Sequence, residues 1–220
     1  MTTTSPSAAK AALRTSARRD RRVARERIGE GPLSGDLTGH AAAIARHLLA
    51  RPGTGSLLVT AFVPTASEPD VLALVAGLRE HLAAAGRDLR VLFPADSGTP
   101  MLDWIEARED DEAADSPGRG FGREPSGPRH GSDVLADADL VLAPALLVAR
   151  DGTRLGHGGG YYDRALAHLA PHAPVIAVVH PWELREAGDL PRAAHDRAID
   201  AILTSDGIVP VDGGRLLLGA

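Results

Sequence analysis

The sequence predicts an α/β fold of three layers, α/β/α, with a central, mostly parallel sheet in a single domain. The main observation is that short apolar segments alternate with amphipathic helical segments along most of the chain. Strands that are apolar throughout are typical of a parallel sheet whose two faces are both covered. The length of 220 residues suits one sizeable α/β domain, and 44% hydrophobic residues is ordinary for a globular protein.

A basic helix is the first predicted element, and it begins near Pro6. Residues 8–28 include neither Gly nor Pro, and they are rich in Ala, Leu and Arg, which favour a helix. Lys10 and Arg14 are four residues apart, so they share one face of this helix. That face is either a solvated surface or a cationic surface directed at an anionic ligand.

The remaining elements are expected in the order that builds such a sheet. Two further helices are predicted over residues 33–51, with Ser34 as the cap, and over residues 70–85, closed by Gly86. The predicted strands are residues 57–62, 89–93, 139–144, 175–179 and 201–204, and residues 208–218 are expected to add an edge hairpin. Residues 106–132 are rich in Gly, Pro and charge, and we expect them to form a mobile excursion from the single domain of residues 1–220.

The composition excludes several classes of protein. The chain has no Cys, which excludes disulfides, thiolate zinc sites and cysteine nucleophiles. A formal net charge of −5 and an aromatic content of 3% argue against nucleic acid as a partner. The longest apolar run, residues 140–149, is far shorter than the about 20 residues that span a bilayer. We expect a cytoplasmic protein, a monomer, without a membrane or nucleic-acid partner.

One glycine-rich segment is the strongest functional signal. Residues 154–164 read Arg-Leu-Gly-His-Gly-Gly-Gly-Tyr-Tyr-Asp-Arg, with four glycines in five positions. Glycines let a backbone approach a ligand closely, and a helix expected over residues 165–170 would bring the loop amides near a helix N-terminus, which suits phosphate. Arg154 could add a charge-assisted contact, and Asp163 stands where a carboxylate could hold phosphate-bound Mg²⁺.

Other interpretations of the segment are weaker or excluded. It could be a flexible turn in which Asp163 caps the following helix. It is not a Walker A loop, because no Gly-Lys-Ser/Thr follows the glycines. No strand is predicted to run directly into it, which argues against a dinucleotide-binding fingerprint.

Residues 154–164 resemble the signature of the 5-formyltetrahydrofolate cyclo-ligase family, Arg-Leu-Gly-x-Gly-x-Gly-(Phe/Tyr)-Tyr-(Asp/Glu)-Arg. The resemblance extends over nearly the whole chain. Lys10 and Arg14 match the family's N-terminal basic pair, Glu68 follows the first strand as a family Glu does, and residues 190–202 resemble its C-terminal Pro…His-Asp motif. Gly122, Glu124 and Pro125 resemble its Gly-Ile-Pro-Glu-Pro segment.

The resemblance implies a function and a set of site residues. Members convert 5-formyltetrahydrofolate and MgATP to 5,10-methenyltetrahydrofolate, ADP and phosphate. By resemblance, Asp163 and Asp196 hold Mg²⁺, while Val63 and Glu68 contact the folate. The residues implied for ATP are Lys10 and Arg154, which are also implied as catalytic, with Arg14, Gly156, His157, Gly158, Gly159, Gly160, Tyr161 and Tyr162.

Alternatives for single residues and for the whole chain remain open at this point. Glu68 could be an acid at the start of the next helix, and Asp196 could be a helix cap. Gly159 stands where some members carry Lys, Arg123 replaces a Pro, and Pro69 replaces an apolar or β-branched residue. The chain could therefore be a paralogue that binds folate or nucleotide without turnover. A sugar-phosphate isomerase or CoA-transferase relative would instead need a catalytic carboxylate on another loop.

Overall fold

The fold of the chain is seen in a computed structural model, which describes residues 5–107, 113–115, 123–193, 196–211 and 213–214. An eight-stranded sheet has the order β13-β12-β10-β7-β1-β2-β3-β6. Its strands are β1 (Leu57–Thr60), β2 (Leu89–Asp96), β3 (Leu102–Ala107), β6 (Arg129–His130), β7 (Leu140–Pro144), β10 (Val175–Val178), β12 (Ala201–Thr204) and β13 (Gly207–Pro210). The five strands from β12 to β2 run parallel, and β13, β3 and β6 pair antiparallel at the two edges. The predicted α/β fold with a mostly parallel sheet is confirmed.

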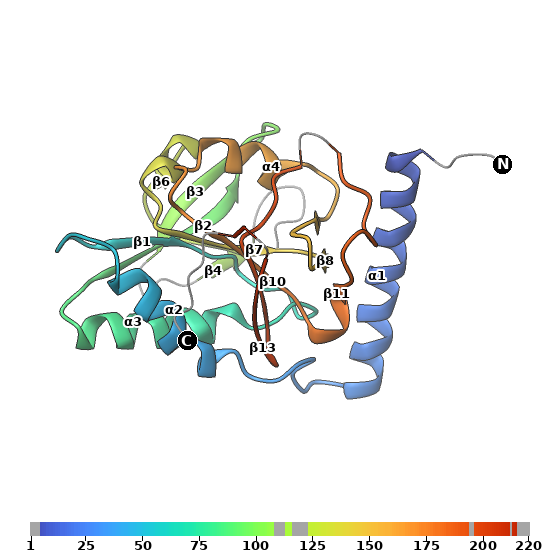
Figure 1. Ribbon diagram of the computed structural model, residues 1–220, viewed down its shortest axis with the longest axis horizontal. Helices are drawn as coiled ribbons and strands as arrows, with labels where there is room; N and C mark the ends of the chain where they lie inside the picture. Colours follow the sequence, from blue (N-terminus) through green and yellow to red (C-terminus); the bar gives the residue numbers. More distant parts are fainter. Residues whose placement is uncertain (1–4, 108–112, 116–122, 194–195, 212, 215–220) are drawn as a thin grey trace.

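Both faces of the sheet are covered. Successive side chains of a strand point to opposite sides, so each strand contributes to an apolar cluster on either face. Val59 and Leu142 belong to an apolar cluster with α2 (Ala41–Leu49) and α3 (Val71–Ala84). Leu58 and Val141 belong to a second cluster, on the face covered by η2 (Ser132–Asp137), α4 (Tyr161–Ala165) and η3 (Leu166–His168). In Figure 1, α2 and α3 lie below the sheet and α4 lies above it.

The basic helix α1 (Pro6–Ile28) forms as predicted, with Ser5 as its N-cap and Gly29, at a φ of 72°, directly after its end. It stands at one edge of the molecule, beside β8 (Leu147–Ala149) and β11 (Leu184–Arg185) (Figure 1). Its apolar contact is small: Ala17 packs in a third cluster with Leu146, Leu155 and Leu190. Because this apolar contact is small, polar contacts position much of the helix.

The helix predicted over residues 33–51 is shorter than expected. It consists of η1 (Thr38–His40) followed by α2, and Ser34 does not cap it. The reason is Asp36, whose carboxylate accepts hydrogen bonds from the backbone amide and the hydroxyl of Thr38. This local turn starts the helical segment at residue 38 and not near residue 33.

The excursion at 106–132 is only partly as predicted. Its first two residues end β3, whereas β4 (Ala113–Asp115) pairs with β5 (Arg123–Pro125), and β6 joins the edge of the sheet. Parts of the expected excursion therefore form short strands. Residues 108–112 and 116–122 lie outside the described part of the chain, so the expected mobility is not tested. Of the edge hairpin expected over residues 208–218, residues 208–210 belong to the edge strand β13, which pairs antiparallel with β12, and residues 212 and 215–218 lie outside the described ranges.

Candidate active site

A cavity of about 800 Å³ lies between α1, the glycine-rich loop and the loop that follows β1. Parallel strands carry ligand sites at their carboxyl ends, and Phe62, after β1, and Pro144, at the end of β7, line this cavity. Every candidate residue from the sequence lines it as well: Lys10, Arg14, Val63, Glu68, Arg154, Gly156, His157, Gly158, Gly159, Gly160, Tyr161, Tyr162, Asp163 and Asp196. The cavity therefore lies between the basic helix and the signature segment.

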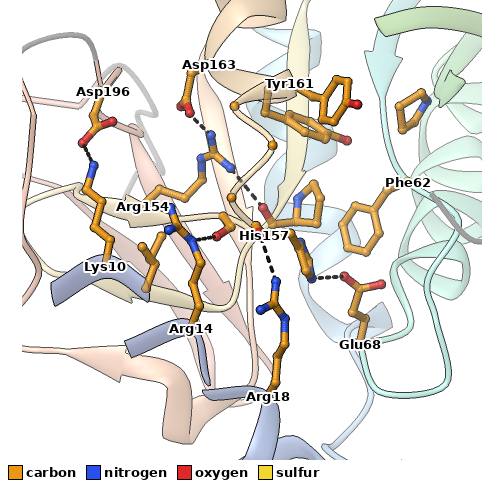
Figure 2. Close-up of a pocket in the computed structure, with 18 of the residues that line it drawn as sticks. Lys10, Arg14, Arg18, Phe62, Glu68, Arg154, His157, Tyr161, Asp163 and Asp196 are labelled. Carbon is orange, nitrogen blue, oxygen red and sulfur yellow. Dashed lines mark hydrogen bonds and ion pairs between the residues drawn. The ribbon is translucent and has the colours of Figure 1, made fainter. Parts of the chain in front are cut away.

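One face of α1 supplies a row of cations to the cavity. Lys10, Arg14 and Arg18 project from the helix toward the glycine-rich loop (Figure 2). Arg14 Nε donates to Gly156 O at 2.9 Å, and Arg18 Nη2 donates to His157 O at 2.7 Å. The basic face is thus directed at the cavity. Arg18 was missed from the sequence, although the spacing of four residues from Lys10 to Arg14 continues to it.

The glycine-rich loop follows β9 (Arg154–Leu155), a short strand that pairs with β8. The expectation that no strand runs into the loop is therefore wrong. The helix expected over residues 165–170 is also displaced, because α4 starts at Tyr161 and gives way to η3 at Leu166. Gly158 and Gly160 have φ angles of 108° and 66°, which only glycine adopts without strain. The chain can therefore turn from β9 into α4 within five residues.

Gly159 has a separate reason to be glycine in this chain. A Cβ at this position would lie 2.5 Å from two ring atoms of Tyr161. The Lys that some members carry would therefore require the Tyr161 ring to move. The packing of Gly159 against Tyr161 is therefore consistent with the absence of a lysine at this position.

Arg154 and Asp163 form an ion pair at 2.8 Å within the loop region. The Arg154 side chain is only 4% exposed, and its guanidinium lies 5.6 Å from the centre of the Tyr162 ring. Burial raises the pKa of the Tyr162 hydroxyl, which keeps it protonated. This hydroxyl is buried and makes no hydrogen bond within the described residues, so it is a donor without a protein acceptor.

Asp196 brings a second carboxylate to the cavity. Its Oδ2 forms an ion pair with Lys10 Nζ and accepts a hydrogen bond from the backbone amide of Ala193 at 2.7 Å. Among the described residues no helix lies between β11 and β12, so the alternative of Asp196 as a helix cap is wrong. The amide contact closes a local turn, and the carboxylate faces the cavity (Figure 2).

The two carboxylates fit a magnesium ion that arrives with phosphate. In the part of the chain that the structure describes, no three His, Asp or Glu side chains gather to hold a metal unaided. Mg²⁺ is usually bound by one or two carboxylates, with phosphate and water oxygens as further ligands. Asp163 and Asp196 line the same cavity and meet that requirement.

Glu68 lies on the opposite wall from the ion pairs, on the loop of residues 61–70, which we call the Glu68 loop. Its Oε2 accepts from the amide of Thr65 at 2.9 Å, and its Oε1 lies 3.8 Å from His157 Nε2. The amides at the start of α3 are instead capped by Asp70. The alternative of Glu68 as a helix-start acid is therefore wrong. Desolvation lowers the pKa of His157, with Arg21, Arg18 and Arg154 acting in the same direction and Glu68 opposing them.

Two residues near the site are structural. Trp104 is buried at 1% exposure and meets Tyr162 edge to face, with ring centres 6.1 Å apart, so it packs behind the cavity. Glu124 accepts from the amide of Asp96 at 2.7 Å and pairs with Arg129. Neither residue lines the cavity. Gly122 lies outside the described residues.

Comparison with known proteins agrees with this site. The model of the 5-formyltetrahydrofolate cyclo-ligase family matches residues 6–205. The chain belongs to this family. The match spans the cationic face of α1, the Glu68 loop, the glycine-rich loop and Asp196, so all the walls of the cavity lie inside it. The resemblance of the signature segment to cyclo-ligases is confirmed, and the protein is a ligase of this family.

Individual relatives of this chain carry the same family name. A 5-formyltetrahydrofolate cyclo-ligase of Mycolicibacterium smegmatis is 37% identical over 201 residues, covering 89% of this chain and 93% of the relative. A mitochondrial cyclo-ligase of Arabidopsis thaliana is 36% identical over 81 residues, which cover 33% of this chain and 29% of the relative.

Two solved structures support the fold. The NMR structure of a 5,10-methenyltetrahydrofolate synthetase from Aquifex aeolicus matches with a TM-score of 0.61 at 20% identity, covering 94% of this chain and 95% of that one. A synthetase of the same name from Mycoplasma pneumoniae matches with a TM-score of 0.54 at 19% identity, covering 89% of this chain and 98% of that one. The cyclo-ligase fold is therefore shared. None of the helices among the described residues is long and apolar enough to cross a membrane.

Proposed function

We propose that this protein uses ATP and Mg²⁺ to cyclise 5-formyltetrahydrofolate to 5,10-methenyltetrahydrofolate, with release of ADP and phosphate. The observation that carries the proposal is the single cavity on which all the candidate residues meet. One wall presents cations and glycine amides, which suit a triphosphate. The other wall presents Glu68, whose Oε1 has room for a donor from a second substrate.

The chemistry explains why such a site is needed. A formamide is a poor electrophile, so the γ-phosphoryl group is first transferred from ATP to the formyl oxygen. The N10 amine of the folate then attacks the formyl carbon and loses its proton. The C–O bond to phosphate breaks, and the former formyl oxygen leaves with the phosphate. A site for this sequence mainly aligns two substrates and stabilises charge.

The residues divide between the two substrates. Lys10, Arg14 and Arg154 bind the phosphates, together with the amides of the loop from Gly156 to Tyr162. Lys10 and Arg154, which face Asp196 and Asp163 in the free protein, stabilise the charge on the transferred phosphoryl group. Bound Mg²⁺ would neutralise phosphate charge, with Asp163 and Asp196 as its protein ligands.

Glu68 and Val63 bind the folate in this proposal. A carboxylate oxygen accepts hydrogen bonds, which suits an N–H group of a pterin ring. Glu68 Oε2 is occupied by Thr65, whereas among the described residues Oε1 has only the more distant Arg21 and His157 groups, each at 3.8 Å. Oε1 is therefore the oxygen that meets the folate.

The test is a direct assay of cyclisation. Purified protein is mixed with 5-formyltetrahydrofolate and MgATP, and the longer-wavelength absorbance of the conjugated methenyl product is followed. We expect a rise that requires ATP and disappears when EDTA removes Mg²⁺. A flat trace from folded protein would contradict the proposal and favour the paralogue without turnover, which titrations with ATP and with folate would then identify. The monomeric state and the cytoplasmic compartment stay predictions.

A further inference from the structure

Three successive residues of the Glu68 loop are each held by a side chain from another part of the chain. Arg25 of α1 donates to Ala66 O, His180 Nε2 lies 3.1 Å from Ser67 O, and Arg21 Nη1 lies 3.8 Å from Glu68 Oε1. A loop on the surface of a protein is ordinarily among its more mobile parts. This one is fixed at the point where it presents its carboxylate to the cavity.

His180 is the least expected of the three anchors. It follows β10, is fully buried, and stacks on Trp182 with ring centres 4.4 Å apart and planes 5° from parallel. Burial lowers its pKa, so the ring is neutral near pH 7 and carries one N–H. A carbonyl oxygen only accepts, so that proton is on Nε2, and the buried Nδ1 has no hydrogen-bond partner within the described residues. The ring's one donor is used on the Glu68 loop.

Arg21 supports the same loop without using up the carboxylate. Its Nε and Nη2 bind the two oxygens of Glu183 at 2.5 and 2.9 Å, and Nη2 also donates to Ala145 O at 2.6 Å. The distance of 3.8 Å to Glu68 is too long for a hydrogen bond, so Arg21 attracts Glu68 but leaves Oε1 able to accept another donor. Glu183 also accepts from the backbone amide of His180 at 2.9 Å, which joins the two anchors.

We propose that His180 is a positioning residue for folate binding, which holds Ser67 O and thereby keeps the Glu68 carboxylate at the cavity wall. The inference rests on the proposed contact between Glu68 and the folate. Within the described residues, Lys10, Arg14 and Arg154 make no hydrogen bond or ion pair to the Glu68 loop. His157 of the glycine-rich loop lies 3.8 Å from Glu68 Oε1, which is too long for a hydrogen bond. Loss of the His180 anchor therefore weakens folate binding and leaves ATP binding unchanged.

The experiment compares two substitutions that differ in one hydrogen bond. His180→Phe keeps a flat ring against Trp182 but has no donor for Ser67 O. His180→Gln places an amide N–H near the position of Nε2. We expect His180→Phe to raise KM for 5-formyltetrahydrofolate about fivefold or more, the effect of one lost hydrogen bond, with KM for ATP within about twofold. His180→Gln is expected to restore most of the folate KM.

His40 offers a matched control. Its Nε2 lies 3.3 Å from Ser205 O, so it also ties a loop carbonyl, but neither residue lines the cavity. His40→Phe is expected to leave both KM values unchanged. If His180→Phe does not fold, His180→Asn takes its place, since the shorter amide does not reach Ser67 O.

Glu68→Gln, measured in parallel, separates the positioning role of His180 from the proposed folate contact of Glu68. A raised folate KM in Glu68→Gln with an unchanged one in His180→Phe would overturn the positioning role alone. Equal increases in both KM values for His180→Phe would also overturn it, because a general loss of structure does not distinguish the substrates. An unchanged folate KM in Glu68→Gln would contradict the proposed role of Glu68 and remove the basis of the inference.

Discussion

Lys10 and Asp196 form an ion pair across the cavity although they lie 186 residues apart in the chain. Both side chains are mostly buried, with 13% and 11% exposure, and both line the cavity. The pair attaches the first turns of α1 to the segment that precedes β12. In the free protein each charge is balanced by the other. In the proposed complex, Lys10 would instead contact phosphate and Asp196 would bind Mg²⁺.

Replacement of Lys10 tests the phosphate side of the site. We expect Lys10→Met to raise KM for ATP about tenfold or more, because a charge-assisted contact to phosphate contributes at least about 1.4 kcal/mol. The KM for 5-formyltetrahydrofolate should stay nearly constant in steady-state kinetics. Arg22→Met is the control, since Arg22 lies on the same helix but is 65% exposed and pairs with Glu26. Equal ATP affinity in the Lys10 variant would contradict the assignment.

Replacement of Asp163 tests the metal side. Asp163→Asn retains the shape of the side chain and removes its charge, so we expect turnover to fall about a hundredfold or more while the fold is retained. Titration of activity with Mg²⁺ should require a higher concentration than in the parent protein. A variant with normal turnover and a normal Mg²⁺ requirement would rule out Asp163 as a ligand.

Gly160 tests the backbone of the glycine-rich loop. Its φ of 66° is strained for any L-residue, and a Cβ there would lie 2.9 Å from the Arg164 guanidinium. We expect Gly160→Ala to raise KM for ATP because the loop amides are displaced. Gly86→Ala is the matched control, with a φ of 72° and open space around its Cβ. Both variants should lose about 1–2 kcal/mol of stability, but only the first should change ATP binding.

Arg21 is expected to be the arginine of α1 that matters most for stability. Its side chain is 4% exposed and pairs with Glu183, which is 2% exposed. Arg21→Met leaves a buried carboxylate without its cation, and breaking such a pair costs about 3–5 kcal/mol. Urea unfolding measures the loss, and adding Glu183→Leu should recover part of it. A loss below about 1 kcal/mol, as expected for the exposed Arg22, would contradict this ranking.

Stability should decrease as the pH falls below about 7. Burial lowers the folded-state pKa of His180, against the opposing charges of Glu183 and Glu68, while Arg21 adds to the lowering. The unfolded chain, whose histidine pKa is about 6.5, then binds more protons than the folded one. The free energy of unfolding therefore falls from pH about 7 down through the folded-state pKa. His157 contributes in the same direction.

The check is the slope of this pH dependence, measured by urea unfolding at several pH values. His180→Gln cannot titrate in this range, so its slope should be smaller than that of the parent protein. An unchanged slope would show that His180 does not carry the effect.

Much of the fold could be predicted because its signals are local. Apolar runs such as residues 175–179 and 201–204 identify buried strands, since a fully covered sheet leaves no polar face. The glycine spacing of residues 156–160 likewise depends only on backbone conformation and close approach. These features require no knowledge of distant residues. The short strands β8 and β9 lacked such a signal, because two or three residues are too few to show a pattern.

The sequence by itself determined the parallel sheet, the basic helix and the glycine-rich segment, and its motifs identified the charged residues that line the cavity other than Arg18. Only the tertiary structure decided what adjacent arginines do. Arg21 and Arg22 are the same residue type on one helix, yet one is buried against Glu183 and the other is exposed. Glu183 lies 162 residues further along the chain, and His180 reaches Ser67 across 113 residues. Contacts of this kind depend on how elements pack, so no local pattern records them.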